Sequence, residues 1–590
     1  MKQFFKFMFA SMLGFFLTFL IIFFIFIGIF ASILSFAERD LIKVHENTVL
    51  HIKLNNPIPE RTSKNPFENI NFLTLKLHNV PGLNDILKNL KKAETDKNIK
   101  GIYLDLSNVP SGIATIEEVR NALLEFKKTG KFIICYGEFY SQSAYYLATA
   151  ADKIYLNPEG MLLFKGLNAQ LMFLKGTLDK LDIEAQIIRH GKYKSAAEPF
   201  MFDKMSKANK EQMQEFVNSI WNNIITAISE SRNIDLYNLN LIADNLDLQN
   251  AYDALKYNFV DKLMYKDELL AELRTKLGIA ENDKISSMTL LKYTHAQGKA
   301  VKKKRSRNKI AIVYANGEIL MGEGDEHTIG SECISKAIRK ARLDNNVKAI
   351  VFRVNSPGGD ALASDIIWRE VVLAKKEKPV IVSMGNVAAS GGYWISCAAD
   401  KIIADPTTIT GSIGVFGIIP NFKNFFKDKL GITFDNVKTN KNADFIPVVR
   451  PLTSYQKSVI QNEVERIYQT FLEHVSKGRN LTIAQVDSIG QGRIWSGVDA
   501  KRIGLIDDLG GLEKAVDLAA EMAELTEYRT IELPILKDLF QQLFEDLISG
   551  AKISYIKKEL GENYTYYKYL KSISEMDGVQ ARLPFEIIIE

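Results

Sequence analysis

Histidine is scarce in this chain, with seven residues among 590. None of the seven stands at a spacing from Asp or Ser that is typical of a Ser-His-Asp triad. A serine nucleophile in this chain would therefore need another base, and lysine is the alternative. Cysteine is scarcer still, with three residues: Cys135, Cys333 and Cys397. They are too far apart for a disulfide framework or a metal site, and we predict buried free thiols.

Cofactor motifs and a large excess of one charge are also missing. The chain has no phosphate loop and no dinucleotide fingerprint. Its 75 Lys and Arg residues against 70 Asp and Glu residues leave a net charge of +5, which does not indicate nucleic acid as the main partner. The basic stretch at residues 299–307 is predicted to be a solvated linker rather than a nucleic-acid site. We therefore expect no metal, no cofactor and no nucleic-acid partner.

One apolar segment is much longer than a core helix requires. Residues 7–37 carry no charged side chain and are rich in Phe, Ile and Leu. A bilayer-spanning helix needs about 20 apolar residues, whereas a cleaved signal has an apolar core of about 7–15. The segment therefore predicts a membrane anchor, with cleavage after a weak site at residues 35–37 as the alternative. Lys2 and Lys6 precede it, which predicts a cytoplasmic N-terminus and a body outside the cytoplasm.

An internal duplication organises the rest of the chain. Residues 96–108 match residues 344–356, and residues 145–158 match residues 393–406, both at an offset of 248 (344 − 96 and 393 − 145). Each copy alternates short apolar strands with helices, which is typical of an α/β fold with mostly parallel strands. We predict these segments: a cytoplasmic stub and transmembrane anchor (1–45), a first protease-like domain (46–292), a basic linker (293–309), a second such domain (310–530) and a C-terminal helical extension (531–590).

A serine in the second copy stands where a nucleophile would be expected. The apolar run PVIVSM is followed by AASGGYW, so Ser390 is predicted at a strand-to-helix turn near free backbone N–H groups. Gly358, Gly359 and Gly391 carry no side chain and can bring N–H groups close to an oxyanion. The alternative is an ordinary turn in which the serine caps the helix.

The first copy differs from the second at this corner. Adding 248 to 142 gives 390, so Gln142 takes the position of Ser390. Pro110 and Ser111 replace the glycine pair 358–359, and the pair 391–392 is replaced as well. The first copy therefore cannot carry out serine chemistry at its own corner.

The first copy instead supplies a lysine that the second copy lacks. Lys194 lies in HGKYKSAAEPF, and its counterpart in the second copy is Asn442, or Ala443 with a shift of one residue. One copy keeps the serine and the other a lysine, which predicts a single composite site built from both halves. A lysine base needs a pKa lowered by about two to three units from its free value near 10.4, and burial supplies such a shift.

Several long motifs in both copies resemble those of a known protein family. NSPGGD, AASGGYWISCAADKI and TGSIGVFG in the second copy, with GKYKSAAEPF in the first, closely resemble the long, tandem-duplicated form of the signal peptide peptidase A family. That family consists of membrane-anchored bacterial Ser-Lys proteases, and the similarity covers nearly the whole chain. It implies an α/β fold: a tandem duplication of a Clp protease/crotonase-like domain with an N-terminal transmembrane helix.

The resemblance also implies roles for individual residues. The roles are Ser390 as nucleophile, Lys194 as general base, Gly358 or Gly359 with Gly391 as oxyanion hole, and Ser412 as the residue that orients the lysine. Lys192 is the neighbour most easily confused with the base.

The function implied by the family is the hydrolysis of cleaved signal peptides and other unfolded apolar peptides. The family further implies attachment to membrane lipid through the N-terminal helix, a homotetramer, and a bacterial inner (cytoplasmic) membrane protein with its catalytic body on the periplasmic side. Two rival hypotheses remain at this point. One is an acyl-thioester enzyme of the crotonase-like fold, and the other is a non-enzymatic membrane scaffold on an inactive protease fold.

Overall fold

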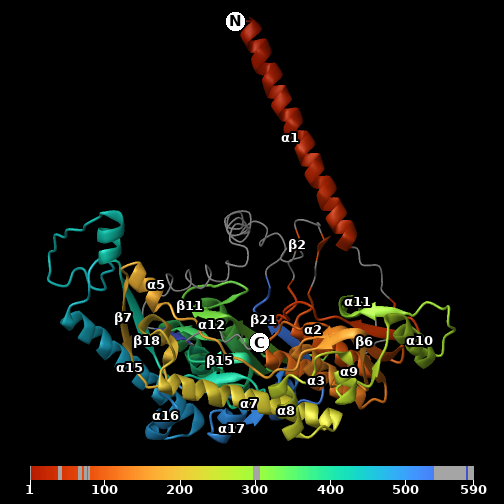
Figure 1. The fold of residues 1–590 in the computed structure, drawn as a ribbon. Coiled ribbons are helices and arrows are strands. Elements are labelled where there is room, and N and C mark those ends of the chain that lie inside the picture. Colours follow the sequence, from red (N-terminus) through yellow and green to blue (C-terminus); the bar gives the residue numbers. More distant parts are fainter. Residues whose placement is uncertain are drawn as a thin grey trace.

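The computed structural model describes residues 2–37, 43–63, 70–71, 76–77, 80–296, 306–536 and 580–582. A long helix, α1 (Lys2–Ala37), projects away from a folded body (Figure 1). Within the described residues, Gln3–Ile25 is the one helical stretch long and apolar enough to cross a membrane, and none of it is buried. Most of the predicted basic linker and most of the predicted C-terminal extension lie outside the described residues.

The first copy is built on a parallel six-stranded sheet in the order β8-β6-β5-β4-β1-β9. Its strands are β1 (Thr48–Ile52), β4 (Ile99–Asp105), β5 (Phe132–Tyr140), β6 (Lys153–Leu162), β8 (Lys262–Leu263) and β9 (Ser287–Thr289). Its helices are α2 (Leu83–Thr95), α3 (Ile113–Lys127), α4 (Gln142–Ala148), α5 (Lys175–Lys180), α6 (Glu198–Met201), α7 (Lys207–Arg232), α8 (Leu236–Asn245), α9 (Ala251–Lys256), α10 (Lys266–Leu277) and α11 (Leu290–His295). The two-residue strands β2 (Ile70–Asn71) and β3 (Lys76–Leu77) pair antiparallel with each other. Apolar residues at helical spacing, such as Ile86, Leu87 and Leu90 of α2, bury one helix face.

The second copy is built on a sheet in the order β19-β17-β15-β13-β10-β21, with β16 and β20 attached beside β15. Its strands are β10 (Lys309–Asn316), β13 (Val347–Ser356), β15 (Val380–Ala389), β16 (Lys401–Ala404), β17 (Ile409–Gly411), β19 (Ile494–Ser496), β20 (Asp508–Leu509) and β21 (Arg529–Leu533). Its helices are α12 (Ser331–Leu343), α13 (Ala361–Lys375), α14 (Gly391–Ser396), α15 (Ser454–Arg479), α16 (Ile483–Ile489), α17 (Gly497–Arg502) and α18 (Leu512–Met522). Strands β13, β15 and β16 begin 248 residues after β4, β5 and β6 (347 − 99, 380 − 132, 401 − 153), as the sequence repeat predicts.

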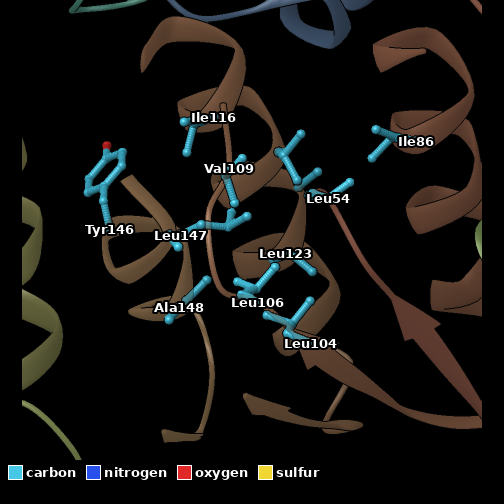
Figure 2. Packing of buried hydrophobic residues seen from close by; sticks show 14 of the residues in the cluster. Leu54, Ile86, Leu104, Leu106, Val109, Ile116, Leu123, Tyr146, Leu147 and Ala148 are labelled. Atoms are coloured by element: carbon cyan, nitrogen blue, oxygen red, sulfur yellow. The ribbon is translucent and has the colours of Figure 1, made fainter. Parts of the chain in front are cut away.

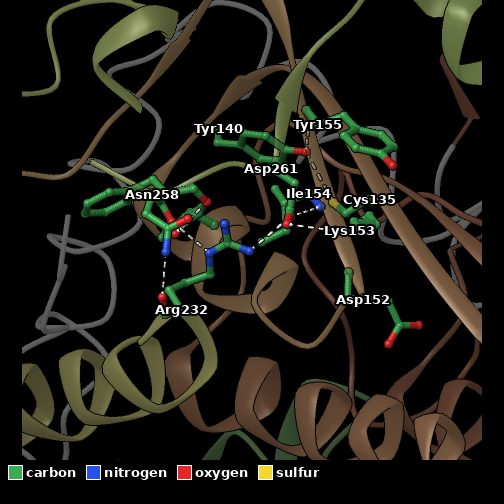
Figure 3. Close-up of polar contacts among 12 residues, drawn as sticks. Cys135, Tyr140, Asp152, Lys153, Ile154, Tyr155, Arg232, Asn258 and Asp261 are labelled. Atoms are coloured by element: carbon green, nitrogen blue, oxygen red, sulfur yellow. Dashed lines mark hydrogen bonds and ion pairs between the residues drawn. The ribbon is translucent and has the colours of Figure 1, made fainter. Parts of the chain in front are cut away.

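The two copies also repeat a partly buried polar network. In the first copy, Asp261 accepts hydrogen bonds from Ile154 N at 2.8 Å and from Arg232 Nη1 at 3.0 Å (Figure 3). In the second copy, Asp507 accepts from Ile402 N and from Arg479 Nη1, both at 2.8 Å. Each arginine ends a long helix, α7 or α15, so the network ties that helix to its sheet. The duplication is therefore visible in side-chain contacts as well as in strand order.

A third sheet combines strands from both copies and from the end of the chain. Its order is β12-β11-β14-β22-β18-β7. The strands are β7 (Glu184–Arg189), β11 (Glu318–Leu320), β12 (Thr328–Gly330), β14 (Gly358–Asp360), β18 (Phe416–Asn421) and β22 (Gln580–Arg582). The pairing of β7 with β18 is antiparallel and joins the first copy to the second. The extension at residues 531–590 is predicted to be helical, but its described residues contain most of β21 and all of β22.

One apolar core continues from the first copy into the second. Figure 2 shows its part in the first copy, where Leu104 and Leu123 pack close to Leu106. The same cluster includes Val351 of β13 and Leu512 of α18 in the second copy. The two copies therefore share buried surface, and a site between them has a fixed geometry.

Candidate active site

Ser390 lies at the corner between β15 and α14, directly after Ala389 and before Gly391. Its φ of 54° lies in the left-handed region that residues other than glycine rarely adopt, so the backbone is strained there. Ser390 N donates to Gly411 O at 2.8 Å, and Trp394 N donates to Ser390 O at 2.9 Å. The Ser390 hydroxyl makes no capping bond to α14. The interpretation of this serine as an ordinary helix cap is therefore not supported.

Lys194 reaches the same corner from the first copy. The antiparallel pair β7–β18 brings the chain across, and Tyr193 N then donates to Gln491 O at 2.9 Å. A β-carbon on Gly492 would lie 2.5 Å from the Lys194 backbone, so glycine is needed for this close approach. A single turn of 3₁₀ helix (Ser195–Ala197) follows directly. Lys194 is fully buried.

The Lys194 amine contacts both predicted serines. Its Nζ lies 2.8 Å from Ser390 Oγ, 3.1 Å from Ser412 Oγ and 3.2 Å from Ser412 O. Burial lowers the pKa of Lys194 well below its ordinary value, because the charged form loses its hydration inside the protein. An amine of this kind is neutral at a lower pH than a surface lysine, and its lone pair can accept a proton from a hydroxyl at 2.8 Å.

The neighbouring Lys192 lies in a different environment. Its side chain is exposed, and its Nζ lies 5.1 Å from the centre of the Tyr193 ring. The Lys192 side chain therefore lacks the burial that distinguishes Lys194. The geometry favours Lys194 over Lys192, as the motif predicts.

The structure separates the three glycines that the sequence groups together. A β-carbon on Gly358 would lie 2.7 Å from Gly391 N, so these two glycines meet beside Ser390. A β-carbon on Gly359 would instead lie 2.1 Å from Ile319 O, because β14 pairs there with β11. Gly358 has a φ of 98°, which also requires glycine. The backbone corner next to the serine is therefore formed by Gly358 and Gly391, with Gly359 facing β11.

The equivalent corner in the first copy is filled by the side chain of Gln142. Gln142 Nε2 donates to Gly166 O at 3.1 Å, and its Oε1 accepts from Lys165 N at 3.0 Å and from Gly166 N at 3.2 Å. These hydrogen bonds to the backbone occupy both polar atoms of the glutamine side chain. Gln142 therefore has a structural role, and the serine–lysine contact lies at the corner of the second copy.

Gln212 of α7 supports the lysine segment and is not predicted from the sequence. Its Nε2 donates to Tyr193 O at 3.2 Å and to Ser195 Oγ at 3.0 Å, and its Oε1 accepts from Ile494 N at 3.3 Å. These contacts bracket Lys194 and join α7 to β19. A polar residue on the buried face of a helix, next to Met213, is the signal that could have identified it.

A strained serine against a buried lysine, at a corner lined by glycine, is an arrangement suited to covalent hydrolysis. Two regions of the chain, residues 125–280 and 373–526, match the model of Peptidase family S49, one in each copy. The chain therefore belongs to Peptidase family S49 and is a serine protease. The tandem duplication and the fold class predicted from the sequence are confirmed, and the two rival hypotheses are not supported.

Individual relatives agree with this assignment. Protease 4 from Haemophilus influenzae is 40% identical over 454 residues, which cover 74% of this chain and 72% of that protein. The chloroplastic serine protease SPPA from Arabidopsis thaliana is 32% identical over 509 residues, which cover 85% of this chain and 74% of that protein. Among solved structures, a ClpP1 mutant from Listeria monocytogenes matches with a TM-score of 0.24 and 17% identity, over 35% of this chain and 94% of that chain.

Proposed function

We propose that this serine protease is a membrane-anchored endopeptidase that degrades cleaved signal peptides and other unfolded apolar peptides, with Ser390 as nucleophile and Lys194 as general base. The observation that carries the proposal is the 2.8 Å contact between the buried amine and the strained serine. The two residues come from different copies of the repeat, and a chance contact between copies has no reason to exclude water from both.

The reaction follows from the contacts of the site. Neutral Lys194 takes the proton of Ser390 as Oγ attacks the peptide carbonyl, and it then gives that proton to the leaving amine. Ser412 holds the amine in position through its hydroxyl at 3.1 Å. The corner of Gly358 and Gly391 receives the oxyanion, and loss of one such donor typically costs about 10²–10³ in kcat. Lys194 finally activates water, which releases the acyl group.

The membrane part of the proposal rests on α1. Its exposed side chains include Phe15, Phe19 and Phe23, and a helix with such a surface is stable only in an apolar environment. Lys2 and Lys6 favour a cytoplasmic N-terminus, with the body on the periplasmic side of a bacterial inner membrane. An anchored site meets apolar peptides where they are released. We also propose that the protein forms a homotetramer. The domain limits 46–292 and 310–530 remain a prediction from the sequence.

The test is peptide hydrolysis by the detergent-solubilised protein. Ser390→Ala and Lys194→Ala should each abolish cleavage of an unfolded apolar peptide, whereas Lys192→Ala, two residues from the base, should keep the wild-type rate. Circular dichroism shows that each variant is folded. Normal cleavage by Lys194→Ala would show that the base is assigned wrongly. A wild-type protein that cleaves folded proteins but no unfolded apolar peptide would contradict the proposed substrate class.

A further inference from the structure

Tyr468 of α15 lies at the far end of a chain of hydrogen bonds that reaches the lysine segment. Its Oη donates to Asp487 Oδ1 of α16 at 2.6 Å and accepts from Gln491 N at 3.2 Å. Gln491 O in turn accepts from Tyr193 N at 2.9 Å, and Tyr193 directly precedes Lys194. The hydroxyl of Tyr468 is therefore joined, through one intervening residue, to the backbone that carries the base.

The loop that follows α16 contacts both Lys194 and Ser412. A β-carbon on Gly492 would lie 2.5 Å from the Lys194 backbone, so the two backbones touch there. Arg493 O accepts from Ser412 N at 2.7 Å. Gln491 has a φ of 50°, in the left-handed region that a residue other than glycine keeps where its surroundings hold it. A shift of this loop would therefore move the base and the residue that orients it.

Comparison of the two copies indicates that the bond from Tyr468 to this loop is an addition. Helices α7 and α15 have 26 residues each and start 247 residues apart (454 − 207), and α8 and α16 start at the same offset (483 − 236). Trp221 therefore takes the position of Tyr468. Its Nε1 donates to Asn240 Oδ1 at 2.8 Å, and Asn240 takes the position of Asp487. An indole N–H donates and cannot accept, whereas a phenol hydroxyl does both. The copy whose loop contacts Lys194 thus carries the aromatic residue that can also hold that loop.

The ring of Tyr468 is held independently of its hydroxyl. It is buried and stacks on the His190 ring, with 3.9 Å between the ring centres. Burial, and then the bond to Asp487, raise the pKa of Tyr468 above its ordinary value, so the hydroxyl stays protonated and keeps donating. Its lone pairs accept from Gln491 N. Removal of the oxygen alone would therefore free the loop and leave the aromatic packing in place.

We propose that Tyr468 is a positioning residue for the base: through Gln491, its hydroxyl keeps the Lys194 amine within hydrogen-bond distance of Ser390. This rests on the proposed function, since it takes Lys194 as the base. Tyr468 acts through the loop rather than on the reacting atoms. Without its hydroxyl, the strained loop relaxes and the lysine segment follows. The amine then lies within reach of the serine for a smaller part of the time, and it gains water.

The experiment is steady-state hydrolysis of an unfolded apolar peptide by the full-length protein in detergent, over a series of pH values. Tyr468→Phe keeps the buried ring and removes the hydroxyl, and it should lower kcat by about 10- to 100-fold with KM close to the wild-type value. The acid limb of the rate profile should move to higher pH, because a better hydrated amine holds its proton more strongly. A merely structural loss of stability would leave the position of this limb unchanged.

Further variants test the path through the hydroxyl. Asp487→Asn keeps an acceptor for the Tyr468 hydroxyl and should retain most of kcat, whereas Asp487→Ala should behave like Tyr468→Phe. Tyr455→Phe removes the same atom from an exposed ring on the same helix and should match wild type in kcat, KM and pH profile.

A wild-type kcat with an unmoved acid limb in Tyr468→Phe would overturn the inference, as would a loss of rate carried entirely by KM. An equal loss in Tyr455→Phe would do the same, because the effect would then belong to α15 as a whole. In each case the proposed function stands if Lys194→Ala, assayed alongside, is inactive. If Lys194→Ala cleaves at the wild-type rate, the proposed function fails, and the inference fails with it.

Discussion

The burial of Lys194 lowers the stability of the folded protein and makes its amine more reactive as a base. Its amine is fully buried, and burial lowers its pKa because the ammonium form cannot keep its hydration. In the unfolded chain the same lysine is hydrated and protonated up to its ordinary pKa of 10.5. At any pH between the lowered pKa and 10.5, folding must therefore remove this proton, which opposes folding. The proposed mechanism requires that amine in its deprotonated form, at 2.8 Å from Ser390 Oγ.

Replacing Lys194 by methionine should abolish hydrolysis and raise the stability of the protein near neutral pH. The folded pKa lies below the unfolded one, so between the two values the unfolded state binds a proton that the folded state does not. Wild-type stability therefore rises with pH across this window, and the advantage of Lys194→Met should shrink towards pH 10.5. Thermal unfolding in detergent, near neutral pH and close to pH 10.5, measures the difference.

The matched control for this prediction is Lys192→Met. Lys192 is exposed, so its replacement should change neither activity nor the dependence of stability on pH. Equal stability of Lys194→Met and wild type at both pH values would mean that the buried lysine does not destabilise the folded protein. The pH dependence of hydrolysis gives a second readout, since the rate should fall as pH drops through the lowered pKa of Lys194.

Among the elements, those made by neighbouring residues could be predicted and those made by distant ones could not. The corner β15–Ser390–α14 follows from an apolar β-branched run, a glycine pair and a helical pattern, all within one short stretch. The pairing of β7 with β18 joins residues more than two hundred positions apart, and no local pattern indicates it. The choice between Gly358 and Gly359 depends on β11, which is equally remote.

Strand β22 could not be predicted either, because it too depends on residues that are distant in the sequence. Three residues, Gln580–Arg582, are too few to show a strand period, and the two edges that they join belong to β14 and β18. A strand of this length forms only where the partner edges already exist. Its place beside Ser390 is thus a property of the assembled sheet, which the segment alone does not encode.

Helix α7 should control the rate through Gln212, which brackets the lysine segment. Gln212→Leu keeps the approximate size of the side chain but removes the hydrogen bonds that Gln212 makes to Ser195 Oγ and Ile494 N, which costs about 1–3 kcal/mol of stability. A shift of Lys194 by a fraction of an ångström should lower kcat by about 10- to 100-fold. KM should stay close to its wild-type value, because Gln212 bonds to the lysine segment and to β19 rather than to β14 or β18.

A control on the same helix separates this effect from general damage to α7. Gln214 is exposed and bonds to Asn218 Oδ1 at 2.9 Å on the surface. Gln214→Leu should leave kcat and thermal stability unchanged. If Gln212→Leu loses stability but keeps its kcat, the glutamine holds the fold and has no part in positioning the base.

At the scale of the whole molecule, the sequence predicts the duplication and the family, but it does not predict the contacts that hold the two copies together. Buried charges join them: Arg353 Nε donates to Glu60 Oε2 at 2.8 Å, and Arg353 Nη2 donates to Glu118 Oε1 at 2.5 Å. Asp405 is fully buried beside Glu117 and Glu118. Patterns of apolar residues carry no signal for such a cluster, because its members lie on separate elements of both copies.

Asp405 makes the contact between the copies sensitive to pH. Burial, and then the charges of Glu118 and Glu117, raise the pKa of Asp405 well above its ordinary value of 3.8. The folded state therefore keeps a proton that the unfolded state has released, and stability falls as pH rises through the raised pKa. Asp405→Asn carries no titrating proton at this position. Its stability relative to wild type should increase as pH is raised from mildly acidic to mildly alkaline values.

Thermal unfolding of both proteins at the two ends of this range tests the prediction, with the exposed Asp435→Asn as control. A stability difference that is the same at both pH values would show that Asp405 is ionised in the folded protein. Because Lys194 and Ser390 come from different copies, loosening of this contact should lower peptide hydrolysis before the protein unfolds. Wild type should then lose activity at alkaline pH at a lower temperature than Asp405→Asn.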